Sequence, residues 1–115
     1  MDDKIPGLMN AVELVNASIA LVQIQQANAP SADQARALQR NLLRLQTELA
    51  VLQAELDAAL HDGASIQGPS AAQVARIDGL LNQVEQATQA STAVDDAIAL
   101  TGDVLDLATS VVANH

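Results

Sequence analysis

Leucine recurs along the middle of the chain with alternating steps of four and three residues. The series is completed by an alanine, and its members are Leu38, Leu42, Leu45, Leu49, Leu52, Leu56 and Ala59. This spacing places all of them on one side of an α-helix and matches the a and d positions of a coiled coil, whereas a half-buried strand would alternate every second residue. We therefore predict a helix over about residues 32–61. Its six leucines, the leucine seam, are expected to pack against other helices or a second copy of the chain.

The start of this helix is marked by a capping-box pattern that occurs twice. Ser31 follows a proline and precedes Gln34 by three residues, and Ser70 stands in the same relation to Gln73. In such a box the serine and the glutamine each satisfy a backbone group of the first turn. The repeat fits either an old duplication or two independently selected helix starts. His61-Asp62-Gly63 is expected to end the seam helix, since glycine suits the left-handed position after a helix.

An earlier helix is predicted over about residues 6–28, and it has two apolar stripes. The first stripe contains Leu8, Val12, Val15, Ile19 and Val22. The second contains Leu14, Leu21 and Ile24. A helix that is apolar on two sides either lies at the centre of a bundle or places one side on another chain.

The last part of the chain is predicted as one helix over about 71–113, because a single heptad line runs through it. The line is Ile77, Val84, Ser91, Ile98, Leu105 and Val112. Such a helix, roughly 65 Å long at about 1.5 Å per residue, would overhang the others and favour a dimer. The competing interpretation breaks it near residues 90–92, with Thr92 as the cap of a fourth helix and Asp95 as its box partner. The expected fold is thus an all-α, single-domain antiparallel bundle over residues 1–115, with coiled-coil-like packing of three long helices or of four shorter ones.

Charge and composition exclude several functions. The net charge of −9 disfavours nucleic acid and anionic membranes as partners, and the absence of Phe, Trp and Tyr removes base stacking. With no cysteine, thiol chemistry and thiolate metal sites are excluded. The most apolar stretch, 12–24, is interrupted by Glu13, Asn16 and Gln23, so membrane spanning is not expected. The expected location is the cytoplasm, with signal-less export left open.

The chemistry-bearing residues do not form a recognisable catalytic set. His61 is expected to cap the seam helix, and His115 is the last residue. The carboxylate pairs, such as Asp95 with Asp96 and Asp103 with Asp106, lie in polar stretches and are expected to be solvated. Phosphate-binding glycine loops and nucleophile-elbow motifs are absent from the sequence. We therefore expect no enzyme activity, no metal and no cofactor.

Three arginines form a strip on the seam helix. Arg36, Arg40 and Arg44 are spaced by four residues and so share one side of the helix. A solvated surface explains them most simply. The functional hypothesis is an electrostatic docking strip, whose partner would be the acidic surface of residues 78–106 in the same chain or in a neighbour.

These features together predict a non-catalytic helical module for protein–protein interaction or self-assembly, of the scaffold, adaptor, small-chaperone or inhibitor type. Its partner would be itself, a dimer in the first instance, or another helical protein. One alternative is an amphipathic-helix carrier or coat for apolar ligands or lipid surfaces, although the basic and aromatic residues typical of interface binders are scarce. Another is an acidic inhibitor of a basic partner.

Overall fold

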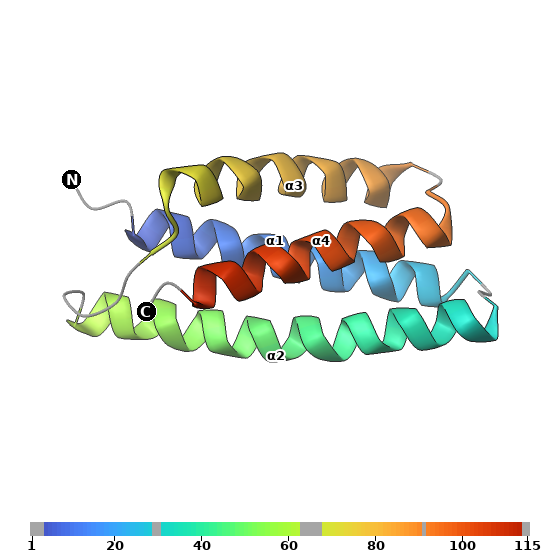
Figure 1. Ribbon diagram of the computed structural model, residues 1–115, viewed down its shortest axis with the longest axis horizontal. Coiled ribbons are helices and arrows are strands. Elements are labelled where there is room, and N and C mark those ends of the chain that lie inside the picture. Colours follow the sequence, from blue (N-terminus) through green and yellow to red (C-terminus); the bar gives the residue numbers. More distant parts are fainter. Residues whose placement is uncertain (1–3, 29–30, 63–67, 91, 114–115) are drawn as a thin grey trace.

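Four helices form the protein in a computed structural model that describes residues 4–28, 31–62, 68–90 and 92–113. Their bounds are α1 Lys4–Gln26, α2 Ala32–Asp62, α3 Ala71–Gln89 and α4 Val94–Val112. Successive helices run in opposite directions along a body of 46 × 22 × 17 Å (Figure 1). The prediction of an all-α antiparallel bundle is confirmed.

In cross-section the four helices lie at the corners of a rhomb. Helices α1 and α4 occupy the two opposite corners that are close together, and α2 and α3 occupy the two that are far apart. Helices α1 and α4 contact each other and both of the remaining helices, whereas the described residues of α2 and α3 make no contact (Figure 1). Because α1 touches three helices, its two apolar stripes are accounted for by a central position within one chain. Helix α3, the next helix along the chain after α2, therefore lies on the opposite corner of the bundle from α2.

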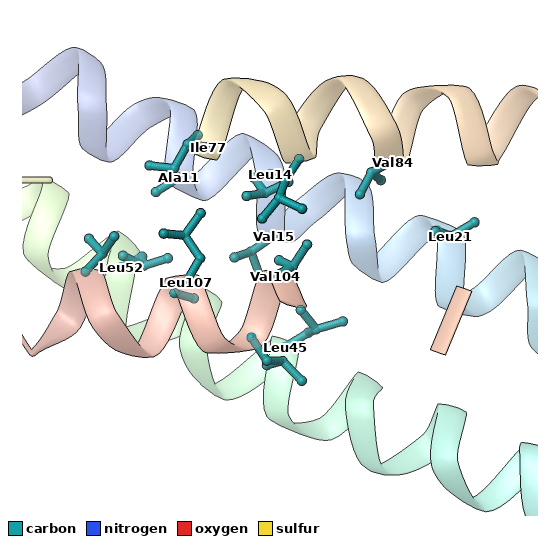
Figure 2. Packing of buried hydrophobic residues seen from close by; sticks show 14 of the residues in the cluster. Ala11, Leu14, Val15, Leu21, Leu45, Leu52, Ile77, Val84, Val104 and Leu107 are labelled. Carbon is teal, nitrogen blue, oxygen red and sulfur yellow. The ribbon is translucent and has the colours of Figure 1, made fainter. Parts of the chain in front are cut away.

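The core consists of small aliphatic side chains drawn from all four helices. Fully buried members include Leu14, Leu45, Ile77 and Val104, and they interdigitate between α1 and α4 and toward the outer helices (Figure 2). Without aromatic rings, the core is filled by Leu, Val, Ile and Ala alone. Such side chains occupy well-defined rotamers and suit closely spaced helices.

The favoured prediction of a single third helix is wrong, and the competing four-helix interpretation holds. Ala90 and Ala93 both have extended backbone conformations, so α3 ends at Gln89 and α4 begins at Val94. The segment 85–93 offers little apolar surface to a straight helix. Folding back instead buries a continuous apolar side of α4 against α1 and α2. The overhanging apolar end that favoured a dimer is consequently absent.

The cap predicted for the fourth helix is also wrong in detail. The residue at the N-cap is Ala93, which has no side-chain capping bond. The Thr92 hydroxyl instead donates to the carbonyl of Ala87, at 3.0 Å, and Asp95 accepts a hydrogen bond from Gln34 of α2 at 3.0 Å. The side chain of the buried Gln25 in α1 donates to the Thr92 carbonyl, at 3.2 Å. Hydrogen bonds with α1 and α3 therefore hold Thr92 in place.

Both predicted capping boxes are present. The Ser31 hydroxyl accepts from the backbone N–H of Gln34 at 3.2 Å, and the Gln34 side chain accepts from the N–H of Ser31 at 3.0 Å. Ser70 and Gln73 form the same pair of bonds at 3.2 and 2.9 Å. The residue after α2, Gly63, lies outside the described residues.

Two glycines in helices differ in the space that is available for a side chain. A Cβ on the buried Gly7 would lie 3.0 Å from Cδ and 3.1 Å from Cγ of the Pro69 ring, whereas a Cβ on the exposed Gly79 would meet nothing within 4 Å. Gly79→Ala is therefore expected to raise the free energy of unfolding by about 0.5–1 kcal/mol, because alanine loses less backbone entropy in a helix.

For Gly7→Ala we expect no such gain, since the rigid proline ring has to move. Urea unfolding followed by circular dichroism would measure both variants. Gly7→Ala should lie at least about 0.5 kcal/mol below Gly79→Ala. Equal free energies of unfolding would show that the close approach of α1 to Pro69 is not a constraint.

Candidate protein-binding surface

The leucine seam of α2 lies inside the bundle of its own chain. Leu38, Leu45 and Leu52 are fully buried, Leu42 is nearly so, and Leu49 and Leu56 are partly buried against the core. Figure 2 shows Leu45 and Leu52 directed toward α4. All six side chains therefore face the core, and the residues they pack against belong to the same chain. A direct role in binding a second protein would require the bundle to open.

The second stripe of α1 is divided between core and surface. Leu14 and Leu21 are buried members of the core cluster that also contains Ile77 and Val84 of α3, and Figure 2 shows Leu14 beside α3. Ile24, in contrast, is 41% exposed. The stripe therefore serves the core over most of its length and leaves one apolar side chain on the surface.

Buried polar groups connect α2 to α4 at the level of Asn41. The Asn41 side-chain amide donates to the Thr101 hydroxyl at 2.9 Å and to the Ile98 carbonyl at 3.3 Å. The Thr101 hydroxyl in turn lies 2.8 Å from the carbonyl of Ala97. These bonds satisfy the buried amide nitrogen and fix the longitudinal position of α2 against α4. The arrangement therefore orients α2 against α4.

The arginines occupy the solvent side of α2. Arg36 pairs with Asp33 of the same helix, one turn earlier. Arg40 and Arg44 are exposed, and neither forms an ion pair or hydrogen bond with the part of the chain that the structure describes. In a protein with net charge −9, two unengaged cations on one helix create a local basic surface.

Apolar side chains accompany these arginines. Leu43 is 54% exposed, and Val51, two turns further along the same side, is also exposed. A shallow hollow of about 260 Å³ is lined by Leu43, Arg44, Thr47 and Glu48. We call the side formed by Arg36, Arg40, Leu43, Arg44, Thr47 and Val51 the α2 outer face. It combines apolar area with positive charge, as protein-binding surfaces often do.

The acidic surface expected to receive the arginine strip is not engaged by it within the chain. The described part of α3, with Asp78 and Glu85, does not contact α2. On α4, Asp96, Asp103 and Asp106 are exposed and form no ion pair with Arg40 or Arg44. Among the described residues, Arg40 and Arg44 therefore have no acidic partner, and Arg36 pairs only with Asp33.

The histidine at the end of α2 takes a local role. The Nδ1 atom of His61 lies 2.8 Å from the carbonyl oxygen of Asp57, four residues earlier. This is the expected capping contact at a helix C-terminus. Over residues 4–28, 31–62, 68–90 and 92–113, no group of three or more His, Cys, Asp or Glu residues is arranged to hold a metal ion.

The arginine strip was predicted from the sequence, but the exposed apolar residues beside it, Leu43 and Val51, were not. Leu43 directly follows the seam residue Leu42, so the sequence pattern does not separate it from the six leucines that face the core. A rotation of about 100° per residue carries Leu43 away from the seam and toward the arginines. Comparison with protein-family models, with curated proteins and with solved structures found no match for this chain.

Proposed function

We propose that this chain is a non-catalytic helical module that binds other helical proteins, copies of itself first, through the α2 outer face. The observation that carries the proposal is the exposed Leu43 between the unengaged Arg40 and Arg44. Each property alone is ordinary on a protein surface, since single exposed leucines and solvated arginines are common. Their combination on the longest helix provides apolar area for affinity and charge for orientation.

The four-helix fold supports binding without opening. The seam and most of both α1 stripes are already buried within one chain. The surface of the folded bundle is then the natural place for a partner. A rigid helix face also binds with little loss of conformational entropy, since its backbone is already ordered.

A second candidate, the carrier or coat for apolar surfaces, is favoured by α1 alone. The segment Ile5–Gln26 is long and apolar enough to cross a membrane by length and composition, although it lies at the centre of the bundle. Opening of the bundle would present both stripes of α1 to lipid. Vesicle flotation would measure binding to neutral lipid vesicles, and circular dichroism would measure the accompanying change in helicity. Binding with a gain in helicity would support this candidate over the first.

The binding surface is tested by reversing one of its charges. Arg40→Glu should weaken self-association by about tenfold, because a like charge would face the acidic partner surface. The matched control is Arg76→Glu, which changes the net charge equally at an exposed site on α3. Both variants should retain wild-type helicity. Sedimentation equilibrium gives the dissociation constants, and equal effects of the two substitutions would contradict the proposal.

A further inference from the structure

Helices α1 and α3 lie side by side and point in the same direction (Figure 1). Two separate hollows lie between them, one near each end, and we call the surface that contains both hollows the α1–α3 groove. One hollow, of about 350 Å³, is lined by Pro6, Gly7, Asn10, Pro69, Ala71 and Val74. The other, of about 270 Å³, is lined by Ala17, Ala20, Glu85, Thr88 and Gln89. Although Glu85, Thr88 and Gln89 line the second hollow, the exposed area of both linings is mainly apolar, which suits an apolar side chain from another protein.

The edges of this α1–α3 groove are acidic. Glu13 lies on α1 between the residues that line the two hollows, and Asp78 lies between them on α3, seven residues before Glu85. All three carboxylates are exposed, and none forms an ion pair with the residues described in the structure. An apolar groove with negative edges favours a helical surface that carries apolar and positive side chains.

The chain itself carries such a surface. On the α2 outer face, Arg40 and Arg44 flank Leu43. The unengaged Arg40 and Arg44 are four residues apart, about 6 Å along the helix, and Asp78 and Glu85 are seven residues apart, about 10 Å. The two sets of charges are opposite in sign, and the arginine pair fits within the length of the acidic pair.

The α2 outer face cannot reach the groove of its own chain. The described parts of α2 and α3 occupy opposite corners of the rhomb without contact, so α2 lies on the far side from α3. We propose that the α2 outer face of one copy docks on the α1–α3 groove of a second copy. This inference rests on the proposed function and names the surface that receives the arginines.

Such a contact joins two different surfaces, so each added copy leaves one of each kind free. Repetition gives a ring or an open chain of copies instead of a symmetric dimer. Because every copy has a net charge of −9, long-range repulsion opposes the contact and its affinity is modest. The expected signature is a mass that rises with concentration, without limit for an open chain of copies and up to a fixed multiple of the monomer mass for a ring.

A charge-swap experiment tests the pairing. The first variant, Arg40→Glu/Arg44→Glu, reverses the α2 outer face, and the second, Asp78→Lys/Glu85→Lys, reverses the groove. All four side chains are exposed, so both variants should fold with wild-type helicity. Each alone should associate at least about tenfold more weakly than the wild type, since like charges would meet. Mixed in equal amounts, they should regain association, because each then offers a complementary surface to the other.

The matched control is Asp96→Lys/Asp103→Lys, which makes the same charge change at exposed sites on α4. It should associate at least as strongly as the wild type, because the smaller net charge reduces repulsion. If the first variant loses association and the second does not, the groove assignment is wrong while the proposed function stands. Loss in both without recovery on mixing also overturns the groove assignment. If the first variant associates like the wild type, the α2 outer face is not the binding surface and both proposals fail.

Discussion

Leu45→Asp is expected to unfold the protein at neutral pH. Leu45 is 0% exposed and lies in the core between α2 and α4 (Figure 2). Removal of a buried leucine side chain costs about 2–5 kcal/mol, and burial of an unpaired carboxylate adds several more. Because a domain of this size is stable by about 5–15 kcal/mol in total, the sum removes most or all of its stability. Loss of the helical circular dichroism signal would report the unfolding.

Two neighbours on the same helix provide controls. Leu43→Asp introduces the same side chain at an exposed position, so we expect a change in stability within about 0.5 kcal/mol. Leu49→Asp alters a partly buried seam position, and its effect should fall between the other two. Wild-type helicity and unfolding midpoint in the Leu45 variant would show that the seam does not face the core.

The second large effect is expected from Asn41→Asp. The Asn41 amide donates to Thr101 and Ile98 in a mostly buried position. An ionised carboxylate at position 41 has no hydrogen to donate to the Ile98 carbonyl, so two acceptor oxygens would face each other. The hydrogen bonds that offset the burial of the amide would not offset the loss of water around the carboxylate. We expect a loss of about 2–4 kcal/mol at pH 7.

The loss should depend on pH in a defined direction. Burial raises the pKa of the introduced carboxyl above its value of about 3.9 in the unfolded chain. The penalty, measured against the wild type at each pH, should therefore be small below about pH 4 and grow as pH rises. Asn41→Leu removes the amide without adding an ionisable group, so its cost should not follow pH in this way. Urea unfolding of all three proteins between pH 3 and 7 measures the difference, and a pH-independent penalty for Asn41→Asp would contradict the buried position.

The parts of the fold with strong local signals were predictable from sequence. The heptad spacing of the seam and the Ser31 and Ser70 boxes each depend on a few neighbouring residues, and the structure contains all three. The number of helices was harder to predict from the sequence. Ile77, Val84, Ile98 and Leu105 keep one heptad phase across the break, so periodicity alone could not reveal that the chain reverses between them.

The placement of helices around the bundle could not be predicted from the sequence for a different reason. Antiparallel order along the chain is compatible with α3 beside α2 or with α3 on the opposite corner. Long-range bonds such as those of Asn41 with Thr101 and of Gln25 with Thr92 accompany the observed arrangement. The α1–α3 groove is a consequence of this arrangement, and no local pattern predicts it.

The central claim is that the folded bundle associates through its surface. Its most direct test is the absolute mass of the unmodified chain, by light scattering after gel filtration over a wide range of concentrations. Refractive index has to report the concentration, because the chain contains no Tyr or Trp. We predict a mass that rises above 11.9 kDa as concentration increases, without loss of helicity. A constant mass of 11.9 kDa at every concentration would contradict self-association through the α2 outer face.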